Sequence, residues 1–298
     1  MKSLTEFKYI LQNKKKRKRT AWKEVFIFLF PGLAGVAVFV LLPFSDVIRR
    51  SFSMTVTGEW SGIRNYDMVL NNQAFMLAAK NTLRFIGICL PLLIMISLFL
   101  AYRMSKSKYM RLLKSTYLLP MAIPAAAVVL IWKLLFDKQG ILNGIWERLG
   151  GQTIDYMGTG AAFWVLVISY IWKNLGYTIV LWLAGIMGIP RGIIEAAEVD
   201  GAGEWTCFFR IILPNLKPTL YAITILSFLN SFKVFREAYL VAGSYPQESM
   251  YLLQHLFNNW FLNLEMDKMA AAAVLTAGVL LVFILLLQIL WDRKEDET

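Results

Sequence analysis

Charged residues are scarce in this chain of 298 residues: Asp, Glu, Lys and Arg together make up 17% of it, against about 25% in globular proteins. Hydrophobic residues account for 57%, and the mean hydropathy is +0.53. A soluble domain with this composition would expose apolar patches large enough to cause aggregation. Disorder is excluded too, because the chain holds 10 Trp, 12 Tyr and 20 Phe. The composition therefore predicts a protein of the lipid bilayer.

Histidine and cysteine are nearly missing, which excludes several kinds of active site. His255 is the only histidine, so metal sites with several His ligands and the H-E-x-x-H motif are excluded. Cys89 and Cys207 predict no disulfide framework. The G-x-x-x-x-G-K-[ST] phosphate loop, the G-x-S-x-G elbow and a pair of acidic residues within the apolar stretches are absent as well. We therefore expect no enzymatic activity and no metal or cofactor bound by this chain, with His255 at a surface or an interface.

Positive charge is concentrated at the start of the chain. The net charge is +11, and residues 1–23 hold nine Lys or Arg and one Glu. A basic run such as 14–19 occurs in nuclear and nucleic-acid-binding segments, and also as a cytoplasmic anchor before a first membrane span. The apolar run that begins at Val25 favours the anchor, and we expect no nucleic-acid partner.

Six stretches are long and apolar enough to form membrane helices, which need about 20 residues at a rise of about 1.5 Å per residue. They predict an all-α polytopic membrane protein with a basic tail at 1–24, a transmembrane domain at 25–291 and a short tail at 292–298. The first stretch is longer than the apolar part of a signal peptide, so we interpret it as a retained span. The predicted spans are 25–44, 83–102, 112–136, 161–187, 219–241 and 269–291.

The distribution of Lys and Arg between the connecting segments predicts the orientation. With the N-terminus in the cytoplasm, the cytoplasmic segments hold 19 of these residues and the outer segments hold 8. We therefore expect a multi-pass protein of the cell membrane with both termini in the cytoplasm.

One predicted cytoplasmic segment, 188–218, has the sequence of a helical hairpin rather than of a loop. Pro190 turns the chain out of the fourth span, residues 192–199 form a short helix, and Gly201 ends it. An amphipathic helix then returns to the membrane and ends before Pro214.

The charge of this hairpin distinguishes two interpretations. A hairpin that lies on lipid would be rich in Lys and Arg on its polar face. Residues 192–209 instead contain four acidic residues and no Lys or Arg. The segment is therefore expected to dock to protein rather than to anionic lipid.

Several motifs resemble those of one transporter family. The hairpin contains Glu195-Ala196-Ala197 and Asp200-Gly201 followed by Pro214, and resembles the EAA loop of the membrane subunits of binding-protein-dependent ATP-binding-cassette importers. Three further motifs are similar to those of the carbohydrate-uptake branch. The chain departs from that branch after the fifth span, where 241–246 replaces the usual T-x-G-G-P. The similar motifs are Gly62-Ile-Arg-Asn65-Tyr66, Asn81-Thr82-Leu-Arg-Phe85 and Ser231-Phe-Lys-Val-Phe235.

The resemblance implies a permease of about six helices, with an importer core at about 77–290. It implies a second permease subunit, two ATPase subunits that use ATP, and an extracytoplasmic binding protein that delivers a sugar or oligosaccharide. It further implies that the hairpin couples the permease to an ATPase subunit. The residues to which this role is assigned are Glu195, Ala196, Ala197, Asp200, Gly201 and Pro214.

Polar residues inside the fourth and fifth spans are candidate contacts for the solute, because placing them in lipid is costly. Aromatic faces together with amide and hydroxyl groups suit a sugar. Lys173 lies near the bilayer midplane and is expected to face protein or water. The same side chains could instead join helices to one another. The candidates are Trp172, Lys173, Asn174, Tyr177, Asn230 and Ser231.

Two other classes of membrane protein are alternatives to the importer permease. An ion-coupled secondary transporter would need an acidic residue within a span or a symmetric repeat, and neither is apparent. An intramembrane enzyme would need one of the catalytic constellations that the chain lacks. The importer permease is the preferred interpretation.

Overall fold

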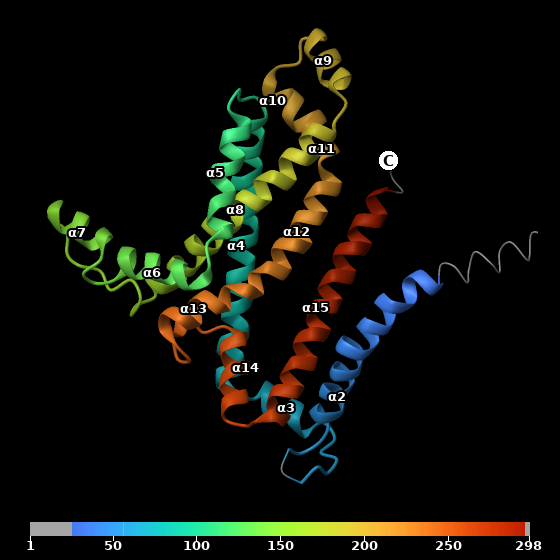
Figure 1. The fold of residues 1–298 in the computed structure, drawn as a ribbon, viewed down its shortest axis with the longest axis vertical. Coiled ribbons are helices and arrows are strands. Elements are labelled where there is room, and N and C mark those ends of the chain that lie inside the picture. The colour runs from blue at the N-terminus through green and yellow to red at the C-terminus, as the bar shows by residue number, and fades with distance from the viewer. Residues whose placement is uncertain (1–25, 56, 296–298) are drawn as a thin grey trace, which may run out of the picture. The chain divides into compact units, whose positions relative to one another are not determined.

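The computed structural model describes residues 26–55 and 57–295 (Figure 1). These residues form helices and turns, and the only pairing of extended backbone among them is an isolated antiparallel bridge between Ser53 and Trp60. The all-α prediction is confirmed. The basic tail at 1–24 and residues 296–298 lie outside the described residues. The chain divides into two compact units, one of residues 1–69 and 265–278, the other of 70–264 and 279–298.

Among the described residues, four helices are long and apolar enough to cross a membrane, and two bent helix pairs raise this number to six if each pair is one span. The six predicted spans correspond to these elements. The single helices are Phe26–Ser51, Gln73–Ser105, Ala161–Gly188 and Met266–Ile289; the bent pairs are Leu112–Ala122 with Ala125–Arg148, and Glu204–Asn215 with Lys217–Ala242.

The third predicted span, 112–136, is not one straight helix. It consists of α5 (Met110–Ala122) and α6 (Ala125–Phe136), and the chain bends by 94° between them. Pro124 causes the break: it has no N–H for a helical hydrogen bond and disfavours helical backbone at the preceding residue. Ile123 accordingly has extended backbone, and Pro124 begins α6 as its N-cap residue.

The second span begins ten residues earlier than predicted. α4 runs from Gln73 to Ser105, whereas hydropathy placed the start at Leu83. The Asn72 side chain accepts a hydrogen bond from the Phe75 N–H at 3.0 Å and caps the first turn. The first ten residues of this helix include the polar Gln73, Lys80, Asn81 and Thr82, which lower the mean hydropathy, so a hydropathy window does not place the start there.

The first unit contains the N-terminal helix, which includes η1 (Ala37–Leu41) and α2 (Leu42–Ser51), and an outer turn that ends in α3 (Arg64–Leu70). Its large apolar side chains are exposed along the first helix, as expected where lipid or another membrane subunit covers them. Asn65 closes the outer turn, because its amide donates to the carbonyls of Ser51 and Ser53, both at 3.0 Å. The motif at 62–66 therefore has a structural role.

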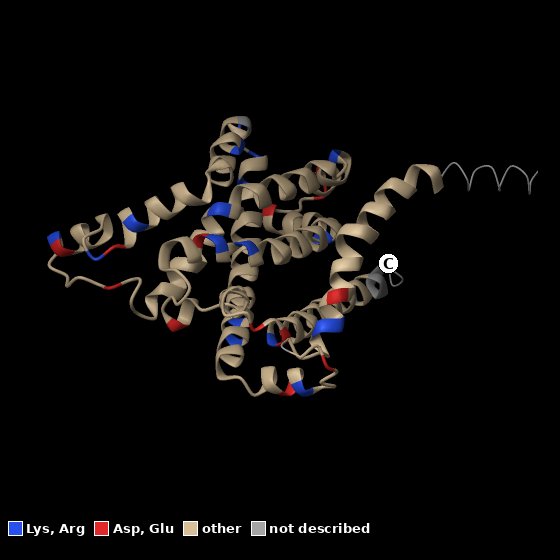
Figure 2. Ribbon diagram, turned by 60° about the horizontal axis from the view of Figure 1, so that its bottom comes forward, with Lys and Arg blue, Asp and Glu red and all other residues tan. Residues whose placement is uncertain are grey.

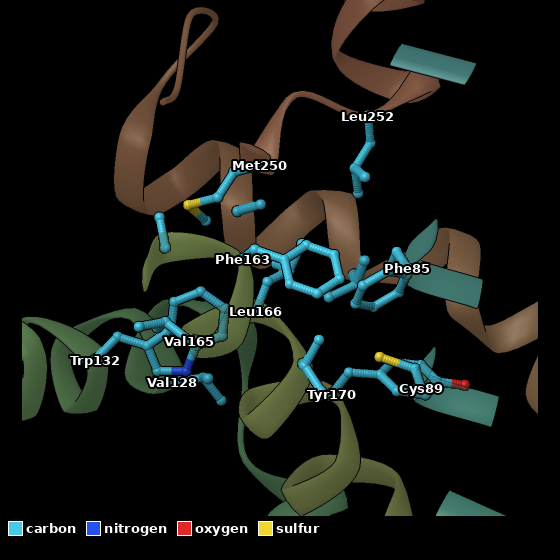
Figure 3. Packing of buried hydrophobic residues seen from close by; sticks show 14 of the residues in the cluster. Phe85, Cys89, Val128, Trp132, Phe163, Val165, Leu166, Tyr170, Met250 and Leu252 are labelled. Atoms are coloured by element: carbon cyan, nitrogen blue, oxygen red, sulfur yellow. The ribbon is translucent and has the colours of Figure 1, made fainter. Parts of the chain in front are cut away.

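The second unit is built around α4 and α8 (Ala161–Gly188), which pack along each other. α5 packs on α8, α12 (Lys217–Ser231) packs on α4 and α8, and α13 (Phe235–Ala242) packs on α6. One core cluster gathers side chains from α4, α6, α8 and the segment around Met250; Figure 3 shows Phe85, Phe163 and Tyr170 converging there. A second cluster gathers around Trp182.

Close backbone approach holds α5 against α8. A Cβ atom at Gly176 would lie 1.8 Å from the Tyr117 carbonyl oxygen, so only glycine permits this contact. Small residues play this part in membrane helix pairs, where lipid supplies no hydrophobic force for association. α8 is also joined to α4, because the Trp182 indole of α8 donates a buried hydrogen bond to the Ser97 hydroxyl of α4 at 3.1 Å.

Charged residues lie mainly at helix ends and in the connecting segments, as Figure 2 shows. In the segment that connects α6 to α8, Asn143 on α7 (Ile141–Arg148) bonds to the backbone of residues 137, 138 and 154, and Lys138 pairs with Asp155 at 2.9 Å. The Lys138 ammonium lowers the pKa of the Asp155 carboxyl.

Candidate functional site

The helical hairpin predicted at 188–218 is present, and its first helix is α9 (Arg191–Val199). Gly201 ends this helix with φ +80°, a left-handed conformation that favours glycine. The N–H of Gly201 bonds to the Glu198 carbonyl at 3.1 Å, and the N–H of Ala202 bonds to the Ala197 carbonyl at 2.9 Å. This pair of bonds is the Schellman ending, which satisfies the last carbonyls and reverses the chain.

The return helix extends further than predicted. α10 (Glu204–Cys207), η2 (Phe208–Ile212) and α11 (Leu213–Asn215) are continuous, so the helix passes through Pro214 instead of ending before it. Pro214 has no N–H to donate to the preceding turn, and the π-helical turn η2 directly before it accommodates the missing bond. The chain then bends by 65° into the helices of the fifth predicted span.

The return helix is fixed to the core by several contacts, whereas α9 meets it through the partly buried side chain of Ile194. Phe208 is buried and packs on Tyr102 of α4, with ring centroids 4.7 Å apart. The Lys106 ammonium lies 2.9 Å from the Glu204 carboxylate and 4.6 Å from the centre of the Tyr102 ring. These contacts anchor the hairpin at one end and leave its first helix free of them.

α9 presents an uncovered surface. It contains no buried residue, and it projects past the ends of α4 and α5 (Figure 1). Glu195, Ala196 and Asp200 are exposed, and Ala197 is half-buried. Val199 is 87% exposed, which is unusual for an apolar side chain on a short helix. The surface combines carboxylates with small and apolar side chains, a composition suited to docking in a cleft of another protein.

A second candidate site is a cleft of about 150 Å³ between α6, α8 and the bent helix of the fifth span. Three of the six predicted solute contacts lie in its wall: Lys173, Asn174 and Asn230. The remaining wall residues are Met121, Val128, Trp132, Ser169, Tyr170, Lys233, Val234, Arg236 and Glu237.

The other three candidates do not line the cleft. Trp172 is 37% exposed, Tyr177 is half-buried, and Ser231 is buried. The Ser231 hydroxyl donates to the Phe228 carbonyl of its own helix at 2.6 Å, which is a packing role. Trp172 and Tyr177, the candidates with aromatic faces, therefore lie outside the wall of this cleft.

Lys173 faces a carboxylate that the sequence interpretation overlooked. Its ammonium donates to Glu237 of α13, whose side chain is 6% exposed, while that of Lys173 is 26% exposed. The statement that no acidic residue lies within a span is wrong, because Glu237 belongs to the predicted span 219–241. Reading every charged position of that span, rather than its mean hydropathy, would have found it.

Hydrogen bonds support the wall of the cleft, and one of them is buried. The Tyr170 hydroxyl donates to the Ser227 carbonyl at 2.6 Å and joins α8 to α12. The Asn174 amide donates to the Tyr170 carbonyl at 2.9 Å, and the Lys233 ammonium donates to the Asn230 amide oxygen at 2.8 Å. Both asparagines thus keep part of their hydrogen-bonding capacity for another partner.

Comparison with known proteins identifies the family. The family model described as "Binding-protein-dependent transport system inner membrane component" matches residues 93–295, more than half of the chain. The chain belongs to this permease family. It is therefore a multi-pass protein of the inner membrane and a transporter component, in agreement with its predicted class.

Individual relatives extend the match to nearly the whole chain. The arabinooligosaccharides transport system permease protein AraP of Bacillus subtilis is 31% identical over 285 residues, covering 89% of this chain and 90% of the relative. The sn-glycerol-3-phosphate transport system permease protein UgpA of Yersinia pestis is 25% identical and covers 84% of this chain and 88% of that protein. A crystal structure of a bacterial ABC transporter for import of the acidic polysaccharide alginate has the same fold, with a TM-score of 0.81 and 23% identity over 93% of this chain and 98% of the other.

Within this permease, the Asn81-Thr82 motif fixes the segment that precedes α14 (Leu253–Leu262). The Asn81 amide donates to the carbonyls of Glu248 and Tyr251 at 2.6 and 3.1 Å, and the Thr82 hydroxyl accepts from the Leu253 N–H at 3.0 Å. The segment at 241–246, where the chain departs from its branch, contains the end of α13 at Ala242, followed by Gly243 at φ +73° as the C-cap residue. The Asn259 amide holds it through the Ser244 carbonyl at 3.0 Å.

His255, expected at a surface or an interface, is buried among the described residues of the permease. Its Nδ1 accepts from the Leu252 N–H at 3.2 Å, and its ring packs edge-on against Phe235 at 4.8 Å between centroids. Burial lowers the pKa of His255 to about 4. The imidazole is therefore neutral at neutral pH and serves as a packing element.

Proposed function

We propose that this chain is the permease subunit of an ATP-driven importer and forms the translocation path for a sugar or oligosaccharide. An extracytoplasmic binding protein delivers the solute, and ATP is bound and hydrolysed by two separate subunits rather than by this chain. A second permease subunit completes the path. The exposed hairpin helix α9 carries the proposal, because a transporter component without a phosphate loop needs a docking surface for its energy source.

The nature of the solute is proposed from the relatives. AraP is named for arabinooligosaccharides, and the alginate transporter, which has also been solved with a pentasaccharide-bound periplasmic protein, imports a polysaccharide. The polar wall of the cleft, with its two partly free asparagine amides, offers the hydrogen-bonding groups that hydroxyl-rich solutes use.

The proposed orientation places the coupling hairpin and both termini in the cytoplasm. It is supported by the excess of Lys and Arg on that side of the predicted spans. In a chain with Cys89 and Cys207 replaced by serine, a membrane-impermeant thiol reagent added from outside is expected to label a cysteine at Gly151 but not one at Gly203. Labelling at Gly203 in sealed cells would reverse the orientation and remove the hairpin from the side of the ATPase subunits.

Uptake by the assembled importer tests the path itself. In proteoliposomes that contain both permease subunits, the ATPases and the binding protein, oligosaccharide uptake is expected to require ATP and the binding protein. Asn174→Ala and Asn230→Ala are each expected to raise the solute concentration for half-maximal uptake several-fold, since a hydrogen bond contributes about 0.5–1.5 kcal/mol. Asn263→Ala, at an exposed position outside the cleft, is the matched control. Unchanged kinetics in both cleft variants would assign these asparagines to helix packing.

A further inference from the structure

The cleft carries more positive charge than its own structure neutralises. Lys173, Lys233 and Arg236 all line it, and Glu237 is the only acidic residue in its wall. Glu237 pairs with Lys173. Within the part of the chain that the structure describes, no carboxylate lies within salt-bridge distance of Lys233 or Arg236. Two positive charges therefore remain at the cleft.

The location makes this excess costly. Lys233 lies in η3 (Phe232–Val234) and Arg236 in α13, both within the bent helix pair that forms the fifth candidate span. A cationic side chain at the centre of a span costs about 2.5–3.5 kcal/mol on insertion scales, and such residues are retained where they face protein or a water-filled path and meet a partner group. The side chains of Lys233 and Arg236 are exposed, so they avoid this cost only where they face a polar path rather than lipid. Lys233 meets only the neutral amide oxygen of Asn230.

The aromatic groups of the cleft argue in the same direction. A neutral sugar is bound largely by stacking its apolar ring face on an aromatic side chain. Trp132 and Tyr170, the aromatic residues of the wall, are 3% and 2% exposed and belong to the packed core. The cleft thus offers little stacking surface and two cationic groups.

From these observations we infer that the solute is an anionic carbohydrate, with a carboxylate or phosphate group held by Arg236 and Lys233. A guanidinium presents paired N–H groups that match two oxygens of either anion, and an ammonium adds a mobile point charge. Lys173, neutralised by Glu237, remains beside Asn174 for the hydroxyl groups. The inference rests on the proposed importer function and specifies its solute.

Uptake by the complete reconstituted importer is measured with three labelled groups of probes: neutral mono- to trisaccharides, uronic acid mono- to trisaccharides, and sugar phosphates. We expect uptake of the uronic acid or the phosphate group, and the group transported identifies the anion. Arg236→Gln should lower that uptake at least ten-fold, as expected for a lost charge-assisted hydrogen bond, and Arg236→Lys should retain part of it. Lys233→Gln removes the second charge independently, and Lys80→Gln, an exposed lysine of α4 outside the cleft, should have no effect.

Co-purification with the partner subunits verifies that each variant assembles. If the importer takes up neutral sugars, and Arg236→Gln and Lys233→Gln do not change this uptake, the inference of an anionic solute is wrong and the proposed importer function still holds. Uptake of an acidic probe that survives both Arg236→Gln and Lys233→Gln would likewise remove these residues from recognition. An assembled importer that hydrolyses ATP and takes up no carbohydrate of any group would overturn the proposed function itself.

Discussion

Glu195→Lys is expected to lower transport by the assembled importer at least ten-fold while leaving the permease folded and inserted. Glu195 is exposed on α9, and no residue of this helix is buried, so the substitution disturbs no packing within the chain. Its effect must come through a partner. Placing like charges opposite each other across an interface costs several kcal/mol, which corresponds to a loss of more than ten-fold in productive docking.

The measurements separate coupling from assembly. ATP-dependent uptake and ATPase activity stimulated by the binding protein are compared with recovery of the intact complex from membranes. Glu147→Lys is the matched control, because Glu147 is also an exposed glutamate on a short helix, α7, but lies in the outer segment. Gly201→Ala is a second coupling variant, since an Ala at φ +80° is strained by about 1–2 kcal/mol and would redirect α9. Wild-type uptake in Glu195→Lys would show that the hairpin is not the coupling element.

Features that depend on local sequence could be predicted. The fourth span was expected at 161–187 and is the helix Ala161–Gly188, because an uninterrupted apolar stretch sets the length of a membrane helix. The hairpin could be predicted for a related reason. Pro190 and Gly201 act on the backbone at their own positions, so they mark where the chain leaves one helix and reverses after the next.

The bend between α5 and α6 and the full length of α4 could not be predicted from the same sequence signals. A hydropathy window averages over about 19 residues and contains no information on bending, so the hydropathy of α5 and α6 predicts a single span. Pro124 was within that window as one residue among many. The first ten residues of α4 could not be predicted from hydropathy either, because a helix that extends beyond the apolar stretch has no hydropathy signal there.

Contacts between residues far apart in the sequence could not be predicted either. Asn81 and Thr82 matched a family motif, but their partners at 248–253 follow only from the fold. His255 was expected at a surface or an interface, because a lone histidine in a connecting segment has no sequence feature that indicates burial within the chain. Lys173 and Glu237 are 64 residues apart, and the structure alone brings them together.

Lys173→Met is expected to destabilise the permease by about 3–5 kcal/mol, the usual cost of removing one partner of a buried ion pair. The reason is the carboxylate left behind: Glu237 has a side chain that is 6% exposed, and within the described residues Lys173 is its only cationic partner at salt-bridge distance. Glu237→Gln should cost less, because the Lys173 side chain is 26% exposed and its ammonium can reach water.

The double variant Lys173→Met with Glu237→Leu decides whether the two side chains act as a pair. An apolar pair of similar volume is often as stable as a buried ion pair, so the double variant should recover most of the stability that Lys173→Met loses. Thermal unfolding of the purified complex measures each change, and Lys133→Met on α6, an exposed lysine without a carboxylate partner among the described residues, is the control. If the losses of the single variants simply add in the double variant, the two residues are not coupled. Recovery of stability without recovery of uptake would show instead that the cleft needs this ion pair for transport, beyond its part in holding α8 against α13.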